Sequence, residues 1–218
     1  MTKLPKFSDA KVLVIGDVML DRFWHGAATR ISPEAPVPIV KVAGVDDRPG
    51  GAGNVAINLA ALGVETTLSG LVGDDEHAKQ LRSAVEVKGV RWSVMPCPAD
   101  TIVKLRVLSR NQQLIRMDFE APIDDYVDES FLQYASNLIA EHDLVLLSDY
   151  AKGTLTNIEA LISACRALNK PVLVDPKGAD FSRYAGATLI TPNLSEFEAV
   201  VGACYQDDTV ISARARDI

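Results

Sequence analysis

Short apolar runs that alternate with helical segments constrain the fold of this chain more than any other feature. The first run, residues 11–15 (KVLVI), is closed by Gly16 and Asp17, and such a run is typical of a strand buried on both faces of a parallel sheet. The alternation predicts an α/β fold, with a mostly parallel sheet between two helical layers. Further strands are predicted at residues 39–42, 66–72, 144–147, 172–174 and 188–190, and helices at 55–62, 74–87, 128–142, 157–168 (capped by Thr156) and 194–201 (ended by Gly202).

Two segments interrupt this alternation. Residues 26–38 contain three prolines and no helical period, and residues 101–119 have the pattern of a hairpin that turns at Arg110 and Asn111. We expect residues of about 23–45 and 101–119 to form a small β lid that projects from the main sheet.

Composition limits the classes of protein to consider. The chain has 218 residues, 48% of them hydrophobic, a formal net charge of -7 and a pI near 5.0. One domain with a small appendage is expected, and no basic surface points to a nucleic-acid partner. No apolar run approaches the roughly 20 residues of a membrane span, and residues 1–9 lack the apolar region of a signal peptide. The three widely spaced cysteines are typical of reduced thiols in a cytoplasmic protein.

Polar residues follow most of the predicted strands. Ligands of open α/β sheets bind at the carboxyl ends of the strands, so these residues are expected along one edge of the sheet. They are Asp17 and Asp21, residues 149–153, residues 175–177 and residues 193–196. Their convergence is the main sequence argument for an active site.

The glycine-rich segment 48–54 is predicted to open the helix that continues to Leu62. Gly50 and Gly51 allow the backbone to approach a ligand closely, and N–H groups at a helix start can meet hydroxyls or an anion. Asn54 offers a donor and an acceptor for a vicinal diol. The alternative is a glycine turn in which Asn54 caps the helix.

Asp21 lies four residues beyond Asp17, past the end of the first strand. A carboxylate at this place can accept hydrogen bonds from two sugar hydroxyls. The alternative is a helix cap or a salt bridge to Arg22 or Arg30. Asp17 is nearer to the sheet, and we expect it to orient loops by hydrogen bonds.

Four motifs in this order carry a family resemblance. They are GDxxxD at 16–21, GGxxN at 50–54, DPK at 175–177 and TPNxxE at 191–196. The chain resembles the ribokinase-like (PfkB) carbohydrate kinases, whose fold is a three-layer sandwich with a β lid. Residues 30–38, 104–116, 147–153 and 191–198 are similar to the heptose-7-phosphate kinase domains of this family. Such a domain is often the first half of a bifunctional enzyme whose second half is an adenylyltransferase.

The resemblance implies a reaction and its cofactors. ATP, with Mg²⁺, would phosphorylate the C1 hydroxyl of D-glycero-β-D-manno-heptose 7-phosphate on the route to ADP-heptose and the lipopolysaccharide core. Asp21, Gly50, Gly51 and Asn54 would hold the sugar. Asn193 and Glu196 match positions near the ATP phosphates and the water shell of Mg²⁺, and Lys177 is a further candidate for the phosphates. The alternative for Asn193 and Glu196 is a helix-start capping pair.

A phosphorylated sugar calls for basic residues near the sugar site. Lys104 and Arg106 share one face of a lid strand, and Arg116 lies on the facing strand, although its face cannot be fixed from sequence. Arginine contacts a phosphate through two parallel hydrogen bonds. The alternative is a solvated lid face or a contact between the lids of a homodimer.

Part of the family pattern is missing. The family's catalytic aspartate lies in a Gly-Ala-Gly-Asp motif, and none follows Glu196. The chain therefore contains no candidate for the catalytic base, and we expect it to bind sugar with little or no turnover alone. The competing hypotheses are a ribokinase-like kinase of another sugar, such as ribose or fructose, and a non-catalytic module that binds sugar phosphates.

Overall fold

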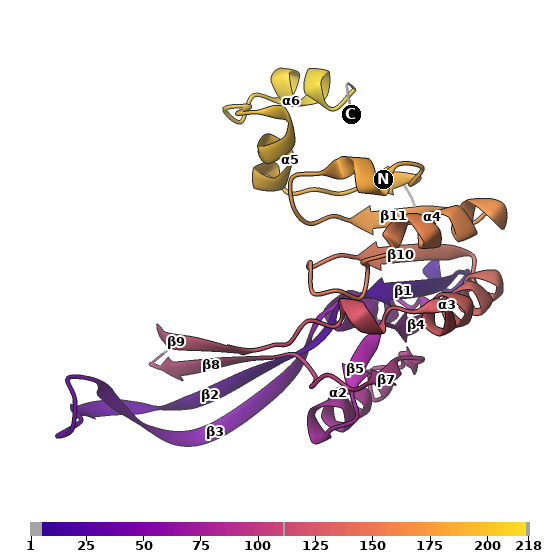
Figure 1. Cartoon of the computed structure of the whole chain (residues 1–218). Coiled ribbons are helices and arrows are strands. Elements are labelled where there is room, and N and C mark those ends of the chain that lie inside the picture. The colour runs from indigo at the N-terminus through magenta and orange to yellow at the C-terminus, as the bar shows by residue number, and fades with distance from the viewer. Residues whose placement is uncertain (1–5, 111, 217–218) are drawn as a thin grey trace.

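A six-stranded parallel sheet forms the centre of the protein. The computed structural model describes residues 6–110 and 112–216. The strand order is β12-β11-β10-β1-β4-β6, and every neighbouring pair runs parallel (Figure 1). The strands are β1 (Lys11–Gly16), β4 (Glu65–Ser69), β6 (Arg91–Trp92), β10 (Leu144–Ser148), β11 (Val172–Asp175) and β12 (Leu189–Ile190).

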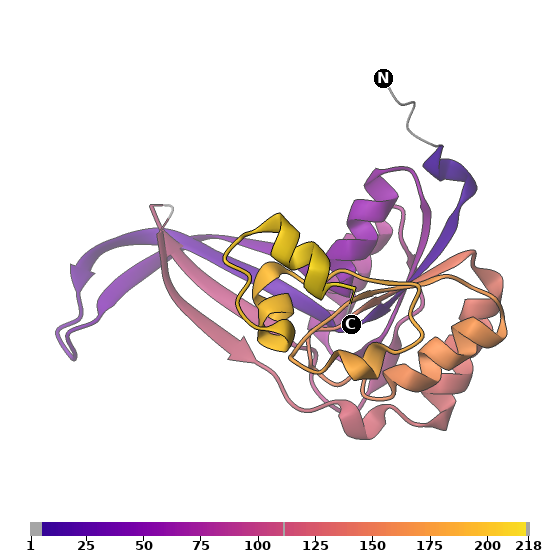
Figure 2. The ribbon, with the colours of Figure 1, turned by 90° about the horizontal axis from the view of Figure 1, so that it is seen from above.

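Helices cover the two faces of this sheet, as Figure 2 shows from above. On β1, Val12 and Val14 belong to the apolar core shared with α1 and α2, whereas Leu13 and Ile15 belong to the core shared with α3 and α4. Alternate side chains of one strand thus serve both layers. The helices are α1 (Ala52–Ala61), α2 (Glu76–Glu86), α3 (Glu129–Glu141), α4 (Ile158–Ala167), α5 (Leu194–Val201) and α6 (Asp208–Arg214). The predicted three-layer α/β fold is confirmed.

The lid is a second, four-stranded sheet that projects from the body (Figure 1). Its strands are β2 (Val18–Ile31), β3 (Pro38–Gly51), β8 (Val103–Ser109) and β9 (Gln112–Phe119), in the order β3-β2-β8-β9. The hairpin predicted around residue 110 is confirmed, and Asn111 lies outside the described residues. The short strand predicted at 39–42 is instead 14 residues long, because it pairs with β2 along nearly its whole length.

Two local predictions are wrong, and a third is incomplete. The glycine segment opens α1 as predicted, with Gly51 as the N-cap, but residues 48–51 are also paired with β2, and α1 begins only at Ala52. The strand predicted at 66–72 is divided at Gly70 into β4 and β5 (Leu71–Gly73), and β5 pairs with β7 (Met95–Cys97) in a separate small sheet. A side chain at residue 70 would collide with the backbone of Gly16. Thr156 does not cap α4: its hydroxyl donates to the carbonyl of Gly153.

Several short elements carried no sequence signal, since each is too short for a hydrophobic period. They are the 3-10 turns η1 (Phe7–Asp9), η2 (Asp124–Tyr126) and η3 (Phe181–Tyr184), and the strands β6 and β7. No helix in the described ranges is long and apolar enough to cross a membrane. Cys97, Cys165 and Cys204 are free and buried, in accord with the thiols predicted from their spacing.

Polar contacts fix the lid to the body. The guanidinium of Arg22 on β2 donates to both carboxylate oxygens of Asp47 on β3, at 2.7 and 2.8 Å. It also donates to Gln80 on α2 at 2.7 Å and lies 3.2 Å from the imidazole of His77. This face of the lid therefore rests on α2 at the base of the lid.

Candidate active site

The carboxyl ends of three neighbouring strands lie in register. Gly16 of β1 is aligned with Ser148 of β10, which is aligned with Asp175 of β11. The loops that follow these strands and β12 form an edge that we call the rim, made of residues 17–21, 149–154, 175–178 and 191–196. The polar residues predicted to converge are therefore together on one edge of the sheet.

Asp17 organises the first part of the rim. Its side chain is fully buried. One carboxylate oxygen accepts from the backbone N–H groups of Tyr150 and Lys152, at 2.8 and 3.0 Å, and the other accepts from that of Thr154 at 3.0 Å. Burial raises the pKa of the Asp17 carboxyl, and the three N–H groups act in the opposite direction. Asp17 thus has the loop-orienting role that its position predicts.

Asp21 lies on β2 at the junction of lid and body. It forms an ion pair with Arg106 of β8, with 2.5 Å between Oδ1 and the guanidinium nitrogen, so neither Arg22 nor Arg30 is its partner in the described chain. A Cβ added to Gly50 would stand 2.5 Å from the other carboxylate oxygen. The absence of a side chain at residue 50 therefore leaves the room that this carboxylate occupies.

Gly51 and Asn54 lie at the junction of β3 and α1. Gly51 has φ +54°, and a side chain there would collide with the carbonyl oxygen of Asp17, so the position requires glycine. The N–H of Ala52 donates to the same carbonyl at 2.9 Å. Asn54 is exposed in the first turn of α1 and is not its N-cap, which is Gly51. The predicted alternative of an Asn cap is thus wrong.

A second group of residues follows β11 and β12. The ammonium of Lys177 contacts the carboxylate of Glu196 at 2.8 Å. Asn193 accepts from the N–H of Glu196, and Glu196 accepts from the N–H of Asn193, at 3.0 and 3.1 Å. These two residues form the capping box of α5. The hydrogen bond to Glu196 raises the pKa of Lys177, which keeps a positive charge at the rim.

Tyr150 lies near charged residues of both groups, although only its place after β10 distinguishes it in the sequence. Burial raises the pKa of its phenol most, and the negative charges of Asp175 and Asp21 raise it further. The phenol is therefore within electrostatic reach of carboxylates from both groups. The residue is 38% exposed and can be reached by a ligand.

Tyr184 links the loop that contains Lys177 to the loop after β10. Its buried hydroxyl accepts from the N–H of Lys177 at 3.0 Å and lies 2.9 Å from a carboxylate oxygen of Asp149, to which it donates. Burial raises the pKa of this phenol to about 12. The hydroxyl remains protonated at neutral pH, so the contact between the loops after β10 and β11 does not depend on pH there.

Carboxylates at the rim fit a divalent cation that is held mainly through water and phosphate. Burial raises the pKa of Asp175, and the negative charge of Glu196 raises it further. A cation between the two carboxylates would relieve their repulsion. No group of three or more His, Cys, Asp or Glu in residues 6–110 and 112–216 forms a metal cluster. Mg²⁺ commonly binds through one or two carboxylates and substrate phosphates.

The lid carries the predicted basic residues on one face. Lys104, Arg106 and Arg116 share this face, because Arg106 and Arg116 are directly opposite each other in the β8–β9 pairing. Lys104 contacts Asp118 and Glu120, at 3.1 Å each. Two residues of this face were missed, Phe23 and Arg48. Phe23 could have been found from its spacing of two residues from Asp21, and Arg48 from its place two residues before Gly50.

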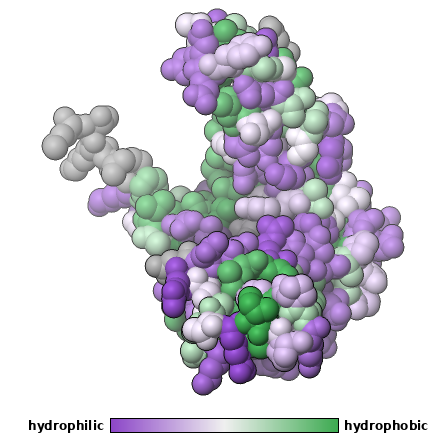
Figure 3. Space-filling view, turned by 90° about the vertical axis from the view of Figure 1, so that its left-hand side faces the viewer, coloured by the Kyte–Doolittle hydropathy of each residue, from purple (hydrophilic) through white to green (hydrophobic). Residues whose placement is uncertain are grey.

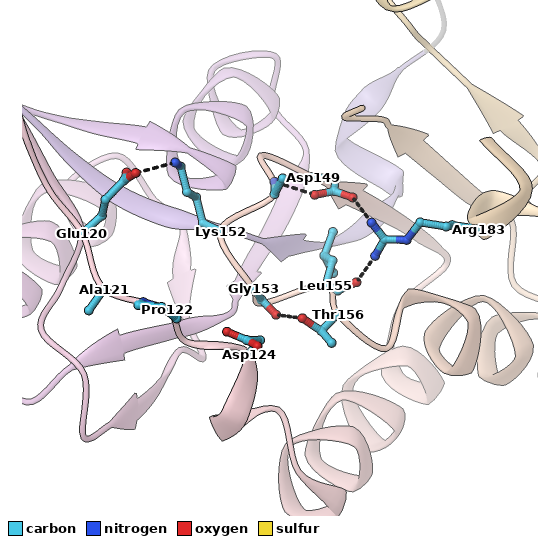
Figure 4. A pocket seen from close by; sticks show the side chains of 11 residues that line it. Glu120, Ala121, Pro122, Asp124, Asp149, Lys152, Gly153, Leu155, Thr156 and Arg183 are labelled. Atoms are coloured by element: carbon cyan, nitrogen blue, oxygen red, sulfur yellow. Dashed lines mark hydrogen bonds and ion pairs between the residues drawn. The ribbon is translucent and has the colours of Figure 1, made fainter. Parts of the chain in front are cut away.

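A pocket of about 450 Å³ opens beside the loop after β10 (Figure 4). Lys152 contacts Glu120 at 2.8 Å on one side of it, and on the other Arg183 donates to the carbonyl of Leu155 at 3.0 Å. Its lining residues include none of the predicted sugar-binding or nucleotide-binding residues. The pocket therefore borders the rim at the loop after β10, and the predicted sugar-binding and nucleotide-binding residues lie outside it.

The parallel sheet, its rim and the projecting lid define an α/β protein of the ribokinase-like class. Residues 9–218 match the pfkB family of carbohydrate kinases. The chain belongs to this family.

Known relatives and solved structures agree with this assignment. The chain is 58% identical to the bifunctional protein HldE of Methylococcus capsulatus over 98% of its length, and 54% identical to that of Shewanella denitrificans over 99%. It spans 45% of either relative, less than half of their length. Escherichia coli phosphofructokinase-2, in its tetrameric inhibited form, matches with a TM-score of 0.73 and 20% identity, over 96% of this chain and 69% of that one. Arabidopsis thaliana ribokinase, solved with ribose and ATP, matches with a TM-score of 0.69 and 17% identity, over 95% of this chain and 68% of that one. The low identities to these two solved structures show the fold alone.

Proposed function

We propose that this chain is the sugar-binding part of a kinase that transfers a phosphoryl group from ATP to the C1 hydroxyl of D-glycero-β-D-manno-heptose 7-phosphate. The observation that carries this proposal is the shared rim, where the carboxyl ends of β1, β10 and β11 lie in register, so that the loops after these strands lie on one edge of the sheet. An acceptor sugar and a phosphoryl donor must meet in such a place. The high identity to HldE proteins supports this sugar over ribose or fructose.

The residues divide by role. Asp21, Gly50, Gly51 and Asn54 would hold the sugar hydroxyls. Asn193, Lys177 and Glu196 would face the ATP phosphates, with Glu196 reaching Mg²⁺ through water. Phosphoryl transfer depends mainly on positioning and on neutralising charge, and the ammonium of Lys177 supplies positive charge on the nucleotide side.

Calorimetry on this chain tests the proposal. We expect D-glycero-β-D-manno-heptose 7-phosphate to bind at least about 100-fold more tightly than the same heptose without phosphate, because charge-assisted contacts contribute about 1.5–3 kcal/mol each. Ribose and fructose 6-phosphate serve as competitor sugars. Equal affinity for all four sugars would contradict the proposed substrate.

A homodimer through the lid is part of the proposal. On the face opposite the charged residues, the strand pairings align four apolar side chains in one row, Val45, Trp24, Val107 and Ile115. Val45 is 58% exposed and Ile115 51% exposed, and Figure 3 shows hydrophobic side chains grouped on the lid end of the molecule. A second copy of the chain would bury this row.

The lid dimer gives a measurable expectation. Ile115→Glu should weaken self-association by at least about 30-fold, since a charge introduced into an apolar contact costs about 2 kcal/mol or more. Analytical ultracentrifugation over a range of concentrations measures this. The matched control is Val87→Glu, at an 83% exposed position on the body after α2, which should leave association unchanged. A dimer that tolerates Ile115→Glu would place the interface elsewhere.

A further inference from the structure

The face of the lid that carries the basic residues has positive and negative side chains and one aromatic ring. Strand pairing sets its side chains in two rows of four, one on each of β3, β2, β8 and β9. We call it the charged face. The row nearer the body is Arg48, Asp21, Lys104 and Asp118, and the next row is Asp46, Phe23, Arg106 and Arg116.

Most cations on this face are paired with carboxylates that have no proposed role in sugar binding. Lys104 contacts Asp118 and Glu120, and Arg116 contacts Asp118 at 2.9 Å. Arg106 differs. Its one carboxylate partner in the described chain is Asp21, the residue proposed to accept hydrogen bonds from the sugar hydroxyls.

The ring of Phe23 holds Arg106 in place independently of this ion pair. The guanidinium carbon of Arg106 lies 5.3 Å from the ring centroid, and that of Arg48 lies 4.9 Å from it. A guanidinium over an aromatic ring keeps its N–H edge available for an anion. Arg106 can therefore remain in position when Asp21 leaves it, with Arg48, which is paired with Asp46, as a second cation beside it.

Neither partner is well exposed to water. The side chain of Arg106 is 21% exposed and that of Asp21 is 24% exposed. Leaving a partly buried charge without a partner is unfavourable. A sugar without phosphate that takes Asp21 would leave Arg106 unpaired, and a phosphate ion that takes Arg106 would leave Asp21 unpaired.

We infer that the Asp21–Arg106 ion pair is a specificity-determining exchange site, which opens fully only for a ligand that carries both sugar hydroxyls and a phosphate. Asp21 then pairs with the hydroxyls, and Arg106, supported by Phe23 and Arg48, pairs with the phosphate. The inference rests on the proposed function for the identity of the sugar. Because Asp21 and Arg106 are paired with each other, binding of the sugar hydroxyls and binding of the phosphate depend on each other.

Inorganic phosphate is the probe that tests the ion pair without any sugar. Asp21→Asn removes the internal competitor of phosphate for Arg106, so phosphate should bind on the order of tenfold more tightly than to the wild-type chain. Glu34→Gln, at the lid tip, makes the same change of net charge at a residue without an ion pair in the described chain. It should change the phosphate affinity less than about twofold. Calorimetry or NMR titration measures both variants.

The double variant Asp21→Asn with Arg106→Gln decides whether the gain acts through Arg106. The tighter binding of phosphate should disappear in it. If the glutamine variant does not fold, Arg106→Lys in the same background should lose most of the gain, because lysine lacks the planar fork. Equal phosphate affinity of Asp21→Asn and Glu34→Gln, or a gain that persists in the double variant, would overturn the inference.

The outcome is separable from that of the proposed function. If the phosphate results hold while heptose 7-phosphate fails to bind the wild-type chain, the exchange site stands and the proposed sugar is wrong. If heptose 7-phosphate binds tightly while Asp21→Asn has no effect on phosphate, the sugar stands and the exchange site is wrong.

Discussion

Replacing Asp17 with alanine is expected to lower the melting temperature of this chain by about 10 °C. The substitution leaves three backbone N–H groups of the loop after β10 without their acceptor. Each buried donor without a partner costs about 1–3 kcal/mol. For a chain of this size, 1 kcal/mol shifts the melting temperature by about 2–4 °C.

Asp74→Ala is the matched control for this change. Asp74 directly follows Gly73 at the end of β5, as Asp17 directly follows Gly16 at the end of β1, but Asp74 is exposed. We expect it to melt within about 2 °C of the wild-type chain, as surface substitutions usually do. Calorimetric melting of the three proteins makes the comparison. If Asp17→Ala melts as the control does, the loop is held by other contacts.

Gly50→Ala is expected to weaken binding of heptose 7-phosphate by about 100-fold while the fold persists. The new methyl group would stand 2.5 Å from the carboxylate oxygen of Asp21, so this carboxylate must move. Two hydrogen bonds from sugar hydroxyls to a carboxylate would be lost, which corresponds to about 2.8 kcal/mol. The side chain of Asp21 can rotate away, so the cost to the free energy of unfolding should stay near 1 kcal/mol.

Two other glycines provide controls for Gly50→Ala. Gly44 is on the same strand, and a Cβ there would meet nothing within 4 Å, so Gly44→Ala should bind the sugar as the wild-type chain does. Gly51→Ala forces a side chain against the backbone of Asp17 at a positive φ and should mainly destabilise the fold. Unchanged sugar affinity in Gly50→Ala would show that Asp21 does not hold the sugar.

The main sheet could be predicted from sequence because its strands have simple patterns. The run at residues 11–15 is apolar throughout, and it is buried on both faces as β1. The helices before and after β10 have clear periods and appeared within one or two residues of their predicted bounds. Local patterns of this kind report burial directly.

The length of the lid strands could not be predicted, because it depends on pairing between distant segments. Residues 26–38 show no period, yet β2 continues to Ile31 because β3 pairs with it across two irregularities. The glycine run predicted the start of α1, which Gly51 caps, but it did not predict that Gly50 and Gly51 also pair in β3. Their place in β3 follows from contacts with Asp17 and Asp21, which no local pattern contains.

The candidate site was predictable to a similar degree. The order of the motifs along an α/β chain places their residues on one rim, and this needs only topology. The partners of each side chain were not predictable. Asp21 pairs with Arg106, which is 85 residues away, and the contact of Arg48 and Arg106 with Phe23 depends on strand register. The register of these strands depends on the pairing of all four lid strands and not on a local sequence pattern.

A crystal structure of this chain with D-glycero-β-D-manno-heptose 7-phosphate tests the central claim most directly. The account predicts the sugar ring at the junction of lid and rim, with hydroxyls on Asp21 and Asn54 and the phosphate on the guanidinium of Arg106, which no longer contacts Asp21. A sugar bound in the pocket beside Lys152 and Arg183, with the Asp21–Arg106 pair intact, would contradict it.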